Sequence, residues 1–134
     1  MAFWLVKSDP DTYSWDNLAK DKETDWDGVR NYQARNNLQA MKKGEEVLFY
    51  HSQTDKAIVG ISIVAKEYFQ DSTTDDNRWV AIRLKIGKKF KNPVTLEQMK
   101  NDPILSNIGL IKQSRLSVMQ VTDVEFMRIV ELSK

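Results

Sequence analysis

Apolar and polar positions follow one another along this chain in short runs that are separated by turn-forming residues. The first run, Phe3–Val6, combines aromatic and branched side chains, which predicts a buried strand. This strand ends before Pro10, because proline cannot donate a hydrogen bond to a sheet ladder. Gly60 interrupts a long apolar run, which indicates a β-bulge or the close approach of another backbone. The pattern predicts further strands at Glu46–His51, Ala57–Phe69, Arg78–Phe90 and Ser114–Val121, and a short extended piece at Thr24–Gly28.

Capping residues mark four short helices between these strands. Asn31 is a suitable N-cap for the second helix, and Gly44 is a suitable stop after it. Two later helices open with a capping box, in which a threonine is followed three residues on by glutamine or glutamate. The helices are expected at Trp15–Lys20, Tyr32–Lys43, Leu96–Lys100 and Asp123–Val130.

The order of these elements predicts the fold class. The strands are clustered and the helices between them are short, which indicates mostly antiparallel strands in an α+β domain or a small β-barrel. The alternation of strand and helix that characterises nucleotide-binding α/β folds is missing. The length of 134 residues and the absence of repeats, low-complexity tracts and linkers predict one domain, residues 1–134.

Composition narrows the possible chemistry. The chain has no cysteine, which excludes disulfides, cysteine-ligated zinc and cysteine nucleophiles. Its formal net charge is only +1, but seven acids and two lysines fall in residues 9–27, and six bases and no acid fall in residues 77–96. Such a distribution can steer a polyanion to one face, or it can form two solvated faces of opposite sign. Both interpretations stay open at this stage.

The N-terminal apolar run is too short for a signal peptide, and a lysine follows it closely. No run of apolar residues reaches the length of a membrane span, about 18–20 residues. We therefore expect a protein without a membrane partner that resides in the cytoplasm, or in the nucleus if its source is eukaryotic.

The chain has few side chains arranged for catalysis. The single histidine, His51, stands beside Ser52 at a strand end, and neighbouring strand residues point to opposite faces. These two side chains therefore cannot form a nucleophile–base pair directly, and a structural histidine is the simpler interpretation. One histidine and scattered acids predict no metal site, and no glycine-rich phosphate loop is present. The sequence predicts a binding module without a cofactor.

The stretch Trp26–Asn37 has the side chains of a recognition site. Its twelve residues include two aromatics, two arginines, three asparagines and a glutamine, few of which suit a core. Trp26 lies at a turn between acids, where its ring can stack on a base or pack on the core. Arg30 and Arg35 can bind phosphate with two parallel hydrogen bonds, or pair with the nearby acids.

Six sequence blocks together resemble the EVE domain family, and they run from one end of the chain to the other. The blocks are Phe3–Pro10, Tyr13–Trp15, Trp26–Asn37, Val47–Ser52, Ile58–Ile61 and Ser114–Val118. The one departure is Asp9, where the family is expected to carry glutamate; the carboxylate is retained.

The resemblance implies a PUA-like fold, related to YTH and ASCH domains: a small curved β-barrel of five or six mostly antiparallel strands with peripheral short helices. It also implies a pocket for a modified base, typically a modified cytosine, that is extruded from its strand. Carried to this chain, the resemblance implies a ligand-binding set made of Ser8, Trp26, Val29, Arg30, Asn31, Tyr32, Arg35, Tyr50, His51, Ser52, Arg115 and Ser117. Leu116 lies between the last two.

The leading hypothesis is therefore a non-enzymatic, monomeric reader of a modified base in DNA or RNA. The first alternative is an RNA- or nucleotide-processing hydrolase of the ASCH-like kind, for which Tyr50, His51 and Ser52 are the available catalytic groups. The second is a sensor of a small ligand or a protein-interaction domain, because the near-neutral chain has few charges for phosphates.

Overall fold

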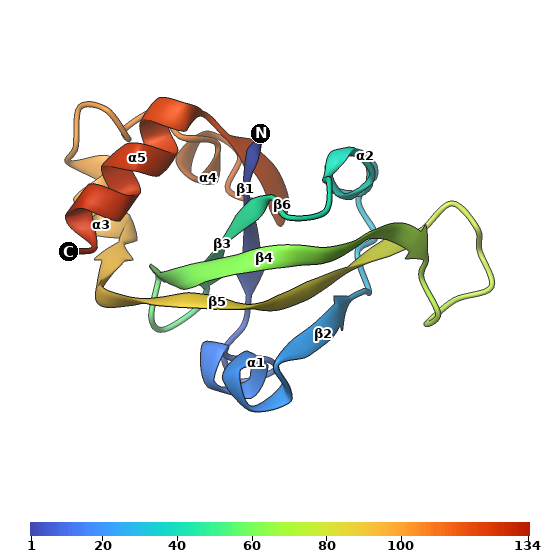
Figure 1. Ribbon diagram of the computed structural model, residues 1–134. Helices are drawn as coiled ribbons and strands as arrows, with labels where there is room; N and C mark the ends of the chain where they lie inside the picture. The colour runs from blue at the N-terminus through green and yellow to red at the C-terminus, as the bar shows by residue number, and fades with distance from the viewer.

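The computed structural model describes all residues, Met1–Lys134, as a six-stranded sheet with five short helices around it (Figure 1). The strands are β1 (Phe3–Ser8), β2 (Glu23–Trp26), β3 (Glu46–His51), β4 (Ala57–Gln70), β5 (Val80–Thr95) and β6 (Val118–Val121). The helices are α1 (Trp15–Asp21), α2 (Tyr32–Ala40), α3 (Leu96–Lys100), α4 (Gly109–Lys112) and α5 (Asp123–Leu132). The strands stand in the order β2-β5-β4-β3-β1-β6, which confirms the α+β class.

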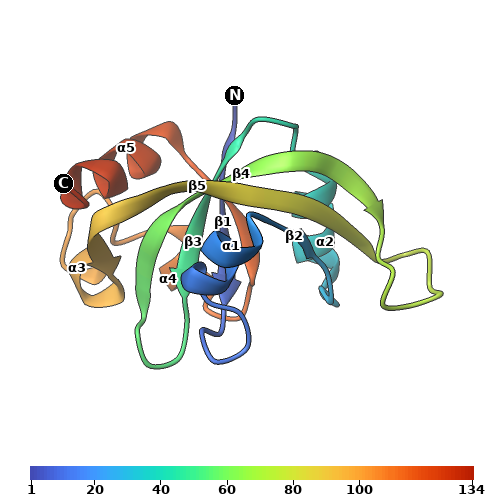
Figure 2. The same ribbon diagram turned by 60° about the horizontal axis from the view of Figure 1, so that its bottom comes forward.

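The sheet is strongly curved but is not closed into a barrel. Only β1 and β3 are parallel, and all other neighbours are antiparallel, as expected. The ladder between the long strands β4 and β5 shifts register at four places, and such bulges bend and twist a sheet. Both strands arch across the whole molecule (Figure 2). The edge strands β2 and β6 do not pair with each other, so an open seam remains between the two ends of the sheet.

Local capping chemistry fixes where the helices begin. The side chain of Asn31 accepts a hydrogen bond from the backbone amide of Ala34 and so caps α2. Complete capping boxes open α1, α3 and α5, including the two predicted at Thr95 and Thr122. No helix is long and apolar enough to cross a membrane.

Both features expected at Gly60 are present, because the β4–β5 register shifts between Ile58 and Gly60 and an added Cβ atom would lie 2.9 Å from the Lys88 backbone carbonyl. The ring of Trp15 from α1 packs against this glycine, and a Cβ atom added there would lie 2.6 Å from the ring. The same ring meets Phe49 of β3 edge-on, at 5.6 Å between centroids. Gly60 therefore lets α1 lie directly on the sheet.

Four stretches differ from the sequence prediction. Helix α2 ends at Ala40 and not at Lys43, because the backbone of the buried Met41 is already extended. Strand β5 continues through Pro93, because residues 90–93 have no partner on β4 and the missing amide of proline costs no ladder bond. A one-turn helix, α4, forms where no element was expected. Strand β6 begins only at Val118, because residues 113–116 form a turn that the Leu116 amide closes by donating to the Gln113 carbonyl.

The two charged stretches meet in the structure and do not form separate faces throughout. Strand β2 from the acidic stretch pairs with β5 from the basic stretch. Asp25 Oδ1 lies 2.9 Å from Arg83 Nε in this pair. Part of the charge asymmetry is therefore neutralised within the sheet.

Candidate functional site

The seam between the two ends of the sheet holds the main cavity of the protein, about 570 Å³ in volume. We call it the seam cavity. One wall comes from the end of β1 and the turn after it, the other from β2 and the turn that leads to α2, and Ser117 closes a third side. The lining residues are Lys7, Ser8, Asp9, Thr12, Tyr13, Thr24, Asp25, Trp26, Asp27, Gly28, Val29, Arg30 and Ser117.

Trp26 forms the aromatic part of the wall. Its ring meets Phe49 edge-on at 5.5 Å and Tyr13 edge-on at 6.3 Å between centroids. Trp26 is half-buried, so the core holds one part of the ring while another part borders the cavity. The Trp26 ring is therefore fixed in place beside an open space, which is the arrangement that stacking on a flat ligand requires.

The polar groups of the seam cavity carry both signs of charge. Burial lowers the pKa of the half-buried Lys7 ammonium, which donates a 2.6 Å hydrogen bond to the carbonyl of Ser114. Burial and then the charges of Asp71 and Asp25 raise the pKa of the Asp27 carboxyl. Because Arg83 and Arg30 pair with those other two acids, Asp27 has no ion-pair partner of its own. A hydrogen-bond donor on a ligand would relieve this unfavourable charge.

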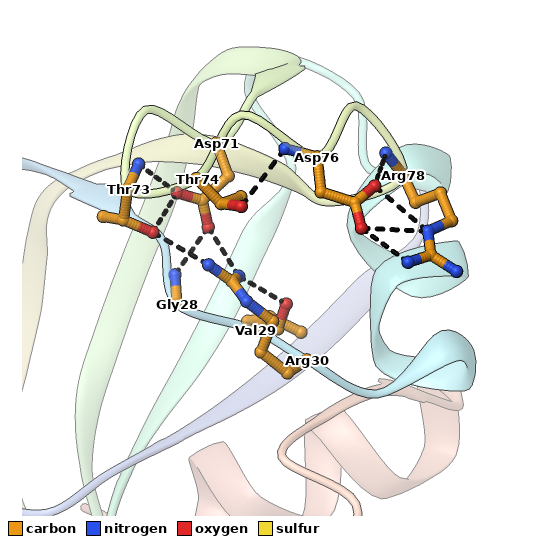
Figure 3. Close-up of polar contacts among 8 residues, drawn as sticks. All are labelled: Gly28, Val29, Arg30, Asp71, Thr73, Thr74, Asp76 and Arg78. Atoms are coloured by element: carbon orange, nitrogen blue, oxygen red, sulfur yellow. Dashed lines mark hydrogen bonds and ion pairs between the residues drawn. The ribbon is translucent and has the colours of Figure 1, made fainter.

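Asp71, at the start of the β4–β5 loop, holds the turn that forms the cavity floor (Figure 3). Its Oδ2 atom accepts hydrogen bonds from the Gly28 amide at 2.7 Å and from Arg30 Nη1 at 3.0 Å. Its Oδ1 atom accepts from the amide and the hydroxyl of Thr73. Gly28 itself has a φ of +77°, a conformation that glycine adopts without strain. The turn is thus fixed from outside by a residue far along the chain.

The Asp71 carboxylate is fully buried and fully satisfied. Burial alone would raise its pKa, but the hydrogen bonds from Thr73, Gly28 and Arg30 outweigh that effect and lower the pKa from 3.8 to about 2. Asp71 is therefore charged at neutral pH, and its charge compensates that of Arg30.

Five of the residues expected from the sequence line the seam cavity: Ser8, Trp26, Val29, Arg30 and Ser117. The hydroxyl of Ser8 donates to the carbonyl of Tyr13 and so ties the β1–α1 turn to the strand. The guanidinium of Arg30 pairs with Asp71, an acid outside the stretch expected to supply its partner.

Four other expected residues lie around the start of α2, outside the seam cavity. Asn31 and Arg115 line a second, shallower hollow of about 370 Å³ together with Lys112. Tyr32 and Arg35 face the β4–β5 loop, where the Arg35 guanidinium lies 5.1 Å from the centre of the Tyr32 ring.

The remaining three, Tyr50, His51 and Ser52, do not line the seam cavity. The Nε2 atom of the buried His51 accepts a 3.0 Å hydrogen bond from the Trp15 amide, and its Nδ1 atom lies 2.8 Å from Asp55. Nδ1 therefore carries the proton, and both ring nitrogens are engaged. Ser52 donates to the Ser8 carbonyl. In this geometry His51 anchors α1 to β3 and leaves no free base at Ser52.

Several lining residues were not expected from the sequence: Lys7, Asp9, Thr12, Tyr13, Thr24, Asp25, Asp27 and Gly28. Most belong to the acidic stretch 9–27, which the sequence alone also allowed to be a solvated face. Their position in the chain could have identified them, because Pro10 and Gly28 follow the ends of two strands, and loop residues beside strand ends often line a site. Nothing local in the sequence identifies Asp71. No group of three or more potential metal-ligating side chains comes together in the structure.

Comparisons with known proteins agree on one family. A model described as the EVE domain matches residues 2–132. Thymocyte nuclear protein 1 of Mus musculus is 33% identical over an alignment that covers 98% of this chain and 74% of the mouse protein.

Solved structures superimpose over nearly the whole chain. The NMR structure of a protein of Rhodopseudomonas palustris has a TM-score of 0.95 at 38% identity, and the match covers 99% of this chain and 93% of that one. The crystal structure of human THYN1 protein was obtained in complex with DNA that contains 5-methylcytosine. It has a TM-score of 0.93 at 30% identity, with 100% of this chain and 98% of that chain covered.

Proposed function

The chain belongs to the EVE domain family, and from that premise we propose that it binds a modified cytosine of a nucleic acid in the seam cavity. The human relative in complex with DNA containing 5-methylcytosine supports this choice of ligand class. The observation that carries the proposal in this chain is the cavity itself, in which the fixed Trp26 ring borders an open space lined by polar groups.

The size of the seam cavity suits an extruded base. Its volume of about 570 Å³ lies within the range of small-molecule pockets, roughly 300–1,000 Å³. Enzymes and readers that work on a single base take it out of the stack and read its pairing edge in such a pocket. Trp26 supplies the stacking surface for the base plane.

The polar lining matches the pairing edge of cytosine. The exocyclic N4 amino group donates hydrogen bonds, and carboxylates are its common acceptors. Asp27 is the acid of the lining whose charge is poorly compensated, so we assign it this role. The Lys7 ammonium and the hydroxyl of Ser117 are available as donors toward the N3 and O2 acceptors. The methyl group at C5 then meets the apolar part of the wall at Val29.

A binding titration with Trp26→Ala tests the proposal. We expect the variant to lose about fivefold to a hundredfold in affinity for a short DNA strand with one 5-methylcytosine, because stacking on the base is lost. Trp26→Phe should retain most of the affinity. Fluorescence anisotropy measures the binding, and a thermal melt checks the fold, because Trp26 also packs on Phe49.

A second variant keeps the test independent of folding. Asp27 is exposed, forms no ion pair and has a raised pKa, so Asp27→Asn should leave the melting temperature unchanged or slightly higher. We expect it to reduce the preference for the 5-methylcytosine strand over a strand with thymine at the same position. Equal affinity of the unsubstituted protein for modified and unmodified strands would refute the proposed ligand.

The hydrolase alternative depends on Tyr50, His51 and Ser52, which lie outside the seam cavity, so we propose binding in preference to hydrolysis. The sensor alternative predicts tight binding of a free nucleoside with no gain from the surrounding strand. Recognition in RNA, a monomeric state and a cytoplasmic or nuclear location stay predictions from the sequence.

A further inference from the structure

A cluster of aromatic rings and guanidinium groups stands on the surface next to the seam cavity. It consists of Tyr32 and Arg35 of α2 with Arg78 and Trp79 at the end of the β4–β5 loop, and we call it the aromatic–arginine cluster. The rings of Tyr32 and Trp79 lie 5.1 Å apart and are tilted by 34°. Arg35 lies over the Tyr32 ring, and Arg78 Nη1 donates a 3.0 Å hydrogen bond to the Tyr32 hydroxyl.

Arg30 joins this cluster to the seam cavity. Its side chain lines the cavity, and its guanidinium carbon lies 5.7 Å from the centre of the Trp79 ring. The loop is closed at its base, because the Asp71 amide donates a 3.1 Å hydrogen bond to the Trp79 carbonyl. In Figure 3 Arg30 points toward Asp71 and Thr73, while Asp76 and Arg78 face each other farther along the same loop. The cavity floor and the cluster are therefore parts of one connected surface.

The cluster is not arranged like part of a core. Half of the Tyr32 side chain is exposed, at 51%, which is unusual for an aromatic residue held by three neighbours. Arg78 forms an ion pair with Asp76, and hydrogen bonds from Arg78 lower the pKa of the Asp76 carboxyl to about 2. Arg35 forms no ion pair; it donates to Asn36 Oδ1 and to the Arg78 carbonyl. The cluster thus presents an exposed ring beside a cation that no acid neutralises.

We propose that the aromatic–arginine cluster is a second contact surface for the nucleic-acid strand, which holds the nucleotide next to the base in the seam cavity. This inference rests on the proposed function, because it assigns a place to the strand that the extruded base belongs to. The neighbouring base stacks on the exposed Tyr32 ring in the place that the Arg35 guanidinium occupies in this structure, and Arg35 then binds the phosphate between the two nucleotides. Base–aromatic stacking tolerates any sequence, so this surface adds affinity without adding a sequence requirement.

Two ligands separate the cluster from the seam cavity. The first is the free nucleoside 5-methyl-2′-deoxycytidine, which fills the cavity alone, and the second is a short single-stranded DNA with one 5-methylcytosine. We expect Tyr32→Ala to weaken binding of the strand by about fivefold to a hundredfold and to leave binding of the nucleoside unchanged. Arg35→Gln should weaken binding of the strand and reduce the dependence of its affinity on salt by about one phosphate contact.

Matched controls exist in the same chain. Tyr68 is equally exposed, at 52%, but makes none of the ring or guanidinium contacts of the cluster, so Tyr68→Ala should bind both ligands normally. Helix α3 lies at the opposite end of the molecule from the β4–β5 loop in both views (Figures 1 and 2), and its last residue is Lys100, which makes Lys100→Gln the charge control.

The possible outcomes separate a failure of the second contact surface from a failure of the proposed function. If Tyr32→Ala binds the strand as the unsubstituted protein does, or loses nucleoside and strand affinity equally, the cluster is not a second contact surface. If the unsubstituted protein binds neither ligand, the proposed function itself fails. Isothermal titration calorimetry of the nucleoside and fluorescence anisotropy of the strand provide the two readouts.

Discussion

At the scale of single residues, Asp71 shows how one buried charge can shape a site that it does not line. Its carboxylate accepts from the Gly28 amide and the Arg30 guanidinium, and its backbone amide donates to the Trp79 carbonyl at the base of the β4–β5 loop. A buried charge of this kind is stable only while all its hydrogen-bond partners stay in place. The geometry of the cavity floor is therefore linked to the protonation state of Asp71.

The pKa of Asp71 gives a prediction for Asp71→Asn. The folded-state pKa of about 2 lies below the ordinary value of 3.8, so the charged form stabilises the fold above pH 3.8. We expect the variant to lose about 2 kcal/mol of unfolding free energy at neutral pH, since its amide cannot accept all four hydrogen bonds. The difference from the unsubstituted protein should shrink as the pH falls from about 4 toward about 2. Urea unfolding at several pH values measures it.

Asp76 provides the control for this prediction. It lies in the same loop and its pKa is also lowered to about 2, in this case by the neighbouring Arg78. Because that ion pair is exposed to solvent, it contributes little to stability. Asp76→Asn should therefore unfold at nearly the same urea concentration as the unsubstituted protein. A larger loss for Asp76→Asn than for Asp71→Asn would contradict the role assigned to the buried carboxylate.

At the scale of elements, the contact between α1 and the sheet decides where the β1–α1 turn stands. Trp15 packs on Gly60 of β4, and its amide donates to His51 at the end of β3. The turn before α1 contributes Tyr13 to the seam cavity and is tied to β1 through Ser8. A helix of seven residues is thus placed by the Trp15 ring, the buried Leu18 side chain and one amide hydrogen bond.

Gly60→Ala tests this placement. The added methyl group would lie 2.6 Å from the Trp15 ring and 2.9 Å from the Lys88 carbonyl, so the helix or the strand must shift. We expect a loss of about 1–3 kcal/mol in unfolding free energy, as is typical of overpacked cores. Gly109→Ala is the control, because its nearest neighbour is the Met119 sulfur at 3.4 Å, and its stability should be unchanged or slightly raised. Equal stability of the two variants would show that the contact at Gly60 is unimportant.

At the scale of the whole molecule, the open seam is what makes room for a ligand. Strands β2 and β6 are the two edges of one curved sheet, and a closed barrel would have paired them. The seam cavity lies between them, so its walls come from both ends of the sheet. The same curvature brings the acidic β2 beside the basic β5, which neutralises part of the charge that the sequence displays.

This charge arrangement predicts a shallow salt dependence of strand binding. The net charge is only +1, and four of the arginines are paired with acids, which leaves Arg35 and Arg115 as the arginines without an ion pair. We expect a slope of about −1.4 in a plot of log affinity against log salt, because each of about two phosphate contacts on a single strand contributes about −0.7. The nucleoside should show a slope near zero. Titrations over a range of sodium chloride concentrations measure both, and equal slopes would exclude phosphate contacts.

The sequence by itself determined most of the elements. Asn31 and the capping boxes at Thr95 and Thr122 begin their helices as predicted, because a cap satisfies amides only a few residues away. Strand periodicity likewise depends on adjacent residues, and β3 has the predicted bounds. The resemblance in the sequence blocks identified the family, since those blocks span the chain.

Only the tertiary structure decided which residues share the site. Tyr32 and Arg35 follow Arg30 closely in the sequence, yet the start of α2 turns them away from the seam cavity and toward the β4–β5 loop. Asp71 bonds to Gly28 across 43 residues, a distance along the chain at which local pattern carries no information. Sheet curvature, which arises from many small bulges and packing contacts, sets which strand ends meet. That is why the cavity could not be located from the sequence, although several of its residues could be named.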